Sequence, residues 1–288
     1  LLGRDVAFGL NLDYAETSSS YNSFDTKRIV FQPSLSFPVS DNGRVSLNYT
    51  YDDLEMSERA DTTTGFVVAN DIAAGRQVTS SIGYNYSYDT RRAGLDPTSG
   101  VLLQFGQDFA GLGGDTKFVK TTAKAIGEKR IFNEEVTLRA TLQGGALAWS
   151  EGNNRVSDRF LIGSSIMRGF ETGGIGPRDQ SNSSDDSLGG NLFVVGSLEA
   201  EFPLGLPEEY GISGGVFYDV GNVWNLDDVV IPAGSSIVGE SGSFRHVIGV
   251  SLFWDTPVGP LQFNVSKALK KEDYDQEQKF EVTLRTDF

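Results

Sequence analysis

The chain has 288 residues, a formal net charge of −15, no cysteine and a single histidine, His246. The lack of cysteine excludes a disulfide framework and a thiolate metal site, and a single histidine argues against a histidine metal cluster and a catalytic triad. The acidic balance argues against nucleic-acid binding, which requires clustered Lys and Arg.

Apolar and polar residues alternate strictly from the start of the chain. Over residues 3–16, Val6, Phe8, Leu10, Leu12 and Tyr14 form one face and polar or small residues form the other. This period of two predicts a β-strand with two different faces. We predict strands of the same kind at residues 24–39, 44–54, 77–89, 101–109, 116–131, 136–149, 191–202, 212–224, 244–254, 261–269 and 279–288.

Twelve such segments, joined alternately by mostly short turns and longer polar loops, are typical of an outer-membrane β-barrel. No apolar run approaches the 18 residues of a membrane helix. Aromatic residues near segment ends, Trp149, Trp224 and Trp254, fit interfacial girdles. A soluble β-sandwich or barrel is the alternative.

The acidic residues of the segment 191–202 favour the membrane barrel over the soluble alternative. Glu199 and Glu201 share one face, opposite Leu198, Ala200 and Phe202. Carboxylates facing the core of a sandwich would be buried at high cost, whereas a water-filled lumen accommodates them. We therefore predict an all-β fold, a transmembrane antiparallel β-barrel with twelve strands in this chain.

The longest interruption between strands runs from about residue 150 to residue 190. Loops of this length are usually functional or disordered. This one contains Phe160, Leu161, Ile162 and Ile166 as well as the sequence Met167-Arg168-Gly169-Phe170. The apolar residues give it material to pack, so we predict that it folds inward and places Arg168 against another part of the protein.

The stretch Phe160–Phe170, FLIGSSIMRGF, resembles the loop motif of the outer-membrane assembly superfamily that includes BamA. That motif has Gly-Gly followed by Val-Arg-Gly-Phe. Here Ser164 replaces the second glycine and Met167 replaces the valine, while Arg168, Gly169 and Phe170 are kept.

Four further segments carry the same resemblance, so that it extends over essentially the whole chain. Residues 89–100 are similar to an Asp-Thr-Arg turn of the family, and residues 256–261 are similar to the family's penultimate hairpin. Residues 217–224 are similar to the strand that carries the acidic partner of the arginine motif. The end of the chain resembles the terminal-strand signal, through Phe280, Val282, Leu284 and Phe288.

The resemblance implies a sixteen-stranded barrel preceded by soluble periplasmic domains, of which residues 1–288 match the last twelve strands. Either the chain is part of a longer protein, or it is a short relative that closes with twelve strands. We expect the first. The pairing between the strands 3–16 and 279–288 is then short, strained or open, because the natural partner of each edge is absent.

The resemblance also implies that Arg168 lies in the lumen and pairs with acidic residues of the wall. The strand pattern makes Glu199 and Asp219 the candidates. A bidentate arginine–carboxylate contact is strong, and lysine does not reproduce its geometry. The alternative is that Arg168 is a solvated loop residue. We interpret Asp185 and Asp186 as a solvated pair in the same loop.

The function implied is that of a BamA-like insertase, which folds nascent proteins into the bacterial outer membrane through a weak seam between first and last strands. Its partners would be the lipid bilayer, nascent outer-membrane proteins and accessory lipoproteins. A secretion translocator of the same superfamily is the alternative, and a passive porin a weaker one. No nucleophile–base pair stands out. We therefore expect no enzyme activity, no cofactor and no metal.

Overall fold

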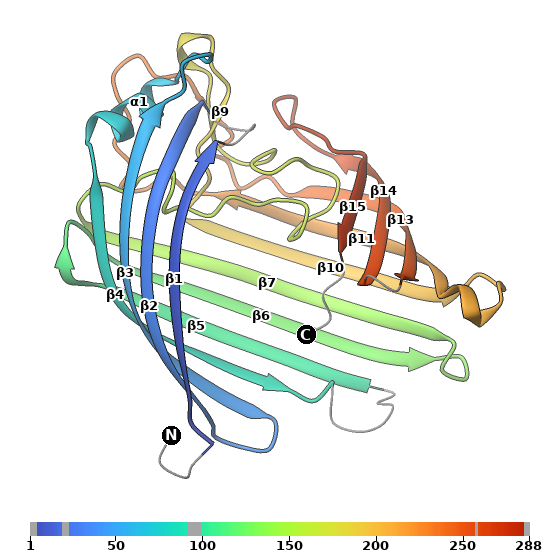
Figure 1. The fold of residues 1–288 in the computed structure, drawn as a ribbon. Helices are drawn as coiled ribbons and strands as arrows, with labels where there is room; N and C mark the ends of the chain where they lie inside the picture. The colour runs from blue at the N-terminus through green and yellow to red at the C-terminus, as the bar shows by residue number, and fades with distance from the viewer. Residues whose placement is uncertain (1–4, 19–22, 92–98, 257–258, 285–288) are drawn as a thin grey trace.

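A computed structural model describes residues 5–18, 23–91, 99–256 and 259–284. It consists of one large curved sheet with a long segment on its concave side (Figure 1). The strands of this sheet are β1 (Ala7–Ser18), β2 (Phe24–Pro38), β3 (Gly43–Glu58), β4 (Gln77–Asp89), β5 (Ser99–Gly114), β6 (Lys117–Ile131), β7 (Val136–Glu151), β10 (Leu192–Pro203), β11 (Ile212–Trp224), β13 (Arg245–Thr256), β14 (Gly259–Lys270) and β15 (Phe280–Leu284).

Each strand of the sheet, which we call the wall, pairs antiparallel with the next one along the chain. The order is β1-β2-β3-β4-β5-β6-β7-β10-β11-β13-β14-β15. The prediction of twelve antiparallel strands is therefore confirmed. β1 and β15 are the two edges, and no ladder joins them within the described residues. The described part of the chain contains no helix that is both long and apolar enough to cross a membrane.

Several strands extend beyond their predicted limits, and the loops contain elements that we did not predict. β5 continues to Gly114, past the predicted end at Phe109. Gly113 and Gly114 both have positive φ, which glycine adopts without strain. The turn that follows is therefore tight, and the two strands are joined without a longer loop. The loops also form helix α1 (Phe66–Ala73) and a small sheet of β12 (Ile237–Val238), β8 (Arg178–Asp179) and β9 (Asp186–Ser187).

The convex face of the wall is apolar, as the alternation predicts. Leu198 is 60% exposed on this face, whereas its neighbour Glu199 is largely buried on the concave side. The residues that we expect to contact lipid and that are exposed here are Leu10, Leu47, Leu138, Leu198, Val250 and Val265. Val6 is half-buried, and the side chain of Leu284 lies outside the described residues.

Replacing Leu198 by arginine should destabilise the protein in a bilayer by about 2–4 kcal/mol, because Leu198 lies in the middle of β10 and a charge there enters hydrocarbon. Urea titration of the protein folded into lipid vesicles measures this difference. Leu204→Arg is the control, since Leu204 follows the end of β10 and lies in a turn. Equal losses for the two variants would contradict a membrane-spanning β10.

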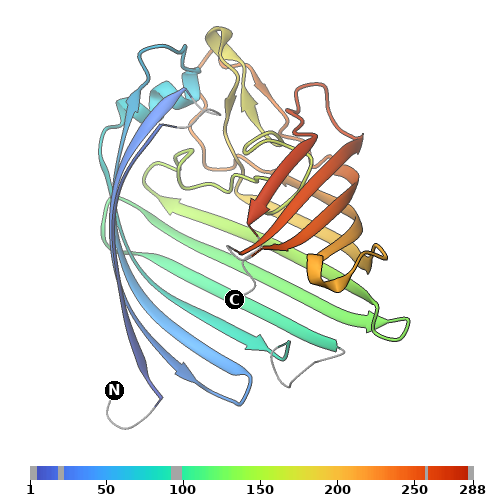
Figure 2. The same cartoon turned by 45° about the vertical axis from the view of Figure 1, so that its right-hand side comes forward.

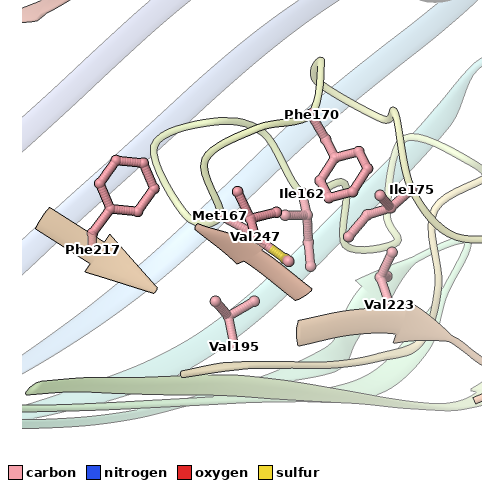
Figure 3. Packing of buried hydrophobic residues seen from close by; sticks show 8 residues of the cluster. All are labelled: Ile162, Met167, Phe170, Ile175, Val195, Phe217, Val223 and Val247. Carbon is pink, nitrogen blue, oxygen red and sulfur yellow. The ribbon is translucent and has the colours of Figure 1, made fainter. Parts of the chain in front are cut away.

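The segment between β7 and β10 lies on the concave side of the wall in both views (Figures 1 and 2). Its apolar side chains meet those of β10, β11 and β13 in one buried cluster. Figure 3 shows its members: Ile162, Met167, Phe170, Ile175, Val195, Phe217, Val223 and Val247. Apolar contact with the wall therefore holds this segment, residues 150–190, which we call the inserted loop, against the concave side of the sheet.

A second buried cluster lies at the end of the sheet where α1 and the inserted loop meet. Val67 and Val68 of α1 pack with Val156 and Leu188 of the inserted loop and with Phe24, Leu54 and Met56 of the strands. Buried carboxylates bind backbone N–H groups beside it. Val67 N donates to Asp179 Oδ2 at 2.8 Å. Val156 N donates to Asp71 Oδ2 at 2.9 Å. The loops thus form one connected layer across this end.

The interpretation of Asp185 and Asp186 as a solvated pair is wrong for Asp186. This side chain is 3% exposed. It accepts hydrogen bonds from Ser23 N at 3.0 Å and from Gly65 N at 2.8 Å, which join three separate loops. Asp185 is partly exposed and pairs with Arg178, at 2.8 Å between Nε and Oδ1. Two adjacent acids therefore have different roles.

Candidate functional site

The turn that presents Arg168 is fixed by its own backbone and by the two apolar residues around it. Ile166 N and Met167 N both donate to the carbonyl oxygen of Gly163, at 2.9 and 3.0 Å. Met167 and Phe170 are almost completely buried in the cluster of Figure 3. Arg168 lies between these two anchors, so its side chain is directed at the wall.

Arg168 and Asp219 form a bidentate ion pair. Arg168 Nε donates to Asp219 Oδ2 at 2.8 Å, and Nη2 donates to Oδ1 at 2.7 Å. The backbone N–H of Arg168 donates to the same carboxylate at 3.1 Å. Asp219 also accepts a hydrogen bond from Ser197, its direct partner in the β10–β11 ladder. Four donors therefore hold this carboxylate in place.

The other groups around Arg168 complete its coordination. Nη1 donates to Glu199, and Nη2 also donates to Ser197 Oγ at 2.8 Å. The guanidinium carbon lies 3.6 Å from the centroid of the Phe217 ring, a close cation–π contact. The structure thus brings Arg168 together with both predicted acids.

Burial makes these interactions strong. The Arg168 side chain is 12% exposed, that of Glu199 is 8% exposed and that of Asp219 is 1% exposed. Burial acts to lower the pKa of Arg168, but its hydrogen bonds and charge interactions with Asp219 and Glu199 outweigh it. The pKa therefore lies above the ordinary value and the guanidinium stays charged. Removing either acid would leave the buried guanidinium of Arg168 only partly compensated by the other.

The ion pairs continue beyond Glu199 across the concave face. Arg139 Nη1 donates to Glu199 Oε1 at 2.9 Å, and Arg139 Nε donates to Glu128 Oε1 at 2.7 Å. Arg91 Nη1 lies 3.9 Å from Glu128 Oε1. Arg91 Nη2 also donates to Asp89 Oδ2 at 2.9 Å. Acids and arginines alternate from Asp219 to Asp89, so the inserted loop is linked to the β4–β5 turn.

We did not predict the roles of Arg139, Glu128 and Arg91. The residues Glu199 and Arg139 are direct partners in the β7–β10 ladder, and Arg139 and Glu128 are direct partners in the β6–β7 ladder. Inward-facing residues of opposite charge on three consecutive strands were visible in the sequence. Their pairing required the register, which the alternation alone does not give.

The residues after Arg168 pair with the segment that leads into the last strand. Gln278 N donates to the carbonyl oxygen of Gly169 at 3.0 Å, and Phe170 forms an antiparallel bridge with Glu277. Gly169 itself has a φ of +91°. The Met167-Arg168-Gly169-Phe170 motif therefore contacts the wall through Arg168. Gly169 and Phe170 contact the segment 275–279 that precedes β15, which we call the approach to β15.

The approach to β15 is anchored a second time, by a fully buried ion pair. Arg245 at the start of β13 donates from Nε and Nη2 to the two oxygens of Asp275, at 2.9 and 2.8 Å. Both side chains have no exposed surface. This contact fixes the chain immediately before Gln276–Gln278.

The residues of the terminal-strand signal face outward where they are described. Phe280 and Val282 are exposed on the convex face of β15. The side chain of Leu284 and all of Phe288 lie outside the described residues. In the described part of the chain, no group of three or more His, Asp or Glu side chains is placed to hold a metal ion.

Together these features define a membrane-type antiparallel β-sheet protein whose longest loop is clamped to the inner face of the wall. A family model described as the Omp85 superfamily domain matches residues 1–288. The chain belongs to this superfamily, and its fold is the transmembrane antiparallel β-barrel fold of BamA.

Individual relatives agree with this family. The chain is 32% identical over 237 residues to the outer membrane protein assembly factor BamA of Neorickettsia risticii. This alignment covers 82% of this chain and 30% of that protein. It is 30% identical over 173 residues to the sorting and assembly machinery component 50 homolog A of Xenopus laevis, covering 57% of this chain and 36% of that protein.

A solved structure supports the fold. The crystal structure of BamA from Haemophilus ducreyi lacking POTRA domains 1-3 matches with a TM-score of 0.80 and 20% identity. The match covers 96% of this chain and 58% of that one. The chain thus spans about a third of the length of the curated relatives reported above.

Proposed function

We propose that this chain is the barrel domain of an outer-membrane protein assembly factor similar to BamA, located in an outer membrane, and specifically in that of a bacterium. The observation that carries the proposal is the set of buried contacts from Arg168 to Asp219, Glu199 and Ser197, which we call the Arg168 clamp. Family membership and the names of the bacterial relatives support it. The partners proposed are the lipid bilayer, nascent outer-membrane proteins and accessory lipoproteins.

The mechanism that we propose uses an exposed strand edge. An edge strand presents unpaired N–H and C=O groups, to which an incoming strand can add by β-augmentation. The inserted loop holds the approach to β15 through Gly169 and Phe170, and Arg168 holds the loop against Asp219. The clamp would therefore set the position of the last strand, and with it the seam at which a nascent strand pairs.

A passive porin fits these observations poorly. Residues of the inserted loop pack against the inner face of the wall, and buried contacts join that loop to α1. A loop held in this way occupies space that a diffusion channel needs. A secretion translocator stays the second candidate, since it belongs to the same superfamily. The number of periplasmic domains in the full-length protein distinguishes it from an assembly factor.

Arg168→Lys tests the proposed function. Lysine keeps the charge but cannot donate to Asp219, Glu199 and Ser197 from one planar group. The loss of one charged hydrogen bond, about 1.5–3 kcal/mol, predicts an assembly rate about tenfold to a hundredfold lower. The full-length protein in vesicles, supplied with an unfolded outer-membrane protein, allows folded product to be measured by heat-dependent gel mobility.

Arg44→Lys is the matched control, because Arg44 is exposed on β3 and, within the described ranges, its side chain makes one hydrogen bond, to Ser36 Oγ at 3.3 Å. We expect it to behave as the unmodified protein. An inserted Arg168→Lys protein with unchanged assembly would contradict the role of the clamp. Passage of the unfolded protein across the membrane, in place of its insertion, would favour the translocator.

A further inference from the structure

The convex face of the wall is hollowed across its middle strands. Two neighbouring hollows, of about 780 and 450 Å³, have five lining residues in common: Val101, Gly127, Ala140, Leu198 and Tyr218. These residues are consecutive cross-strand partners from β5 to β11. The two hollows therefore form one groove, which crosses five strands along a single rung.

Small residues make the floor of this groove. Gly127 and Ala140 are its centre, with Ala125, Gly196 and Ala200 beside them. A Cβ added to Gly127 would have no heavy atom within 4 Å, so the space above it is open. The rim consists of exposed aliphatic side chains: Val101, Leu138, Leu142, Leu198, Val216 and Ile248.

One end of the groove is lined by the exposed Lys129, while Glu128, which also lines this hollow, is paired with Arg139. Lys129 is paired across the ladder with Leu138 of the rim. It lies two residues before the end of β6, and the turn that follows exposes 74% of the Phe132 side chain. A lysine near the end of a membrane strand lies at the level of the lipid headgroups, where it attracts anionic lipid.

We propose that this groove binds one anionic phospholipid, with an acyl chain over Gly127 and Ala140 and the phosphate beside Lys129. The apolar rim and small-residue floor accept a hydrocarbon chain, because they bury it without displacing any side chain. The charge of Lys129 complements the phosphate. The groove opens on the convex face, whereas the Arg168 clamp lies on the concave face, although Arg139, Glu199 and Phe217 of the clamp network are also among the groove's lining residues. Lipid binding in the groove does not depend on the assembly function.

A photoactivatable lipid tests the site in the full-length protein. Phosphatidylglycerol with a diazirine on its acyl chain is placed in nanodiscs of phosphatidylethanolamine, and crosslinked peptides are mapped by mass spectrometry. We expect crosslinks concentrated on β6, β7 and β10 around Gly127, Ala140 and Leu198. Phosphatidylcholine with the same acyl chain should label this region about fivefold less, because its headgroup has no net charge.

Two substitutions remove the two halves of the site. Gly127→Leu fills the floor without meeting another atom at its Cβ and should abolish the concentrated crosslinks. Lys129→Gln should lower phosphatidylglycerol labelling to the phosphatidylcholine level. The controls are Ala148→Leu, on the same face of β7 but outside the groove lining, and Lys270→Gln, at the far end of β14. Both should label as the unmodified protein does.

Folding of each variant is verified by its heat-dependent gel mobility, so that a loss of labelling reports on the groove. Crosslinks spread evenly around the convex face would overturn the proposal, because they indicate ordinary surrounding lipid only. Equal labelling by the two headgroups would overturn the part assigned to Lys129. Unchanged labelling of a folded Gly127→Leu protein would show that the acyl chain does not lie over the floor.

Discussion

Replacing Asp219 by alanine should release the inserted loop from the wall. This carboxylate is 1% exposed and accepts hydrogen bonds from Arg168 through its backbone N–H, Nε and Nη2. Removing it leaves a buried guanidinium with its charge only partly compensated, since Glu199 remains. Breaking a buried ion pair on one side costs about 3–5 kcal/mol, and here the cost favours the open state of the loop.

Hydrogen exchange measures this opening directly. The N–H groups of Ile166 and Met167 are protected by the turn at Gly163. If opening of the loop limits their exchange, 3–5 kcal/mol corresponds to exchange faster by about 10² to 4 × 10³ times. Asp227→Ala is the control, since Asp227 is an exposed loop acid bonded to Asn225. It should leave exchange at residues 163–170 unchanged.

A double-mutant cycle separates the ion pair from other effects of Asp219. Arg168→Ala removes the buried cation, so Arg168→Ala combined with Asp219→Ala should accelerate exchange less than the two single effects added together. Contacting residues of one network show such coupling, whereas independent residues do not. Strict additivity would mean that Asp219 acts on the loop by a route other than Arg168.

The wall could be predicted almost completely from the sequence, because a strand's two faces repeat every second residue. That local rule gave twelve strands and also placed Glu199 and Asp219 on one face of β10 and β11. Both acids contact Arg168 in the structure. The apolar residues of the loop predicted that it folds inward with Arg168, whereas the pairing of Arg168 with acids of the wall was implied by the resemblance of this stretch to a family motif.

The loop layer could not be predicted, because its structure depends on contacts between residues far apart in the chain. Asp186 is buried because Ser23 and Gly65 donate to it across 163 and 121 residues. Nothing near Asp186 in the sequence indicates these donors, and a pair of adjacent acids in a polar loop is more often solvated. The same reason applies to α1, whose buried face is covered by residues of the inserted loop.

Replacing Gly169 by alanine should displace the motif as strongly as the loss of Asp219. Gly169 has a φ of +91°, and a Cβ there would lie 2.8 Å from Val247 Cγ1. Backbone strain of about 1–3 kcal/mol and overpacking of about 1–3 kcal/mol add to roughly 2–6 kcal/mol. Gly127→Ala is the matched control, because its Cβ would meet no atom within 4 Å and its φ is not positive.

The Gly169→Ala protein also tests whether the loop holds the last strand. Gln278 N donates to the carbonyl oxygen of Gly169, and Gln276 N donates to that of Gly174. If the motif positions the approach to β15, exchange at Gln276 and Gln278 should accelerate together with exchange in the loop, although both lie more than a hundred residues away in sequence. Faster exchange in the loop with unchanged exchange at these two residues would show that the Arg245–Asp275 pair suffices to hold the approach. The proposed link between the clamp and the seam would then be wrong, even if the clamp itself forms as described.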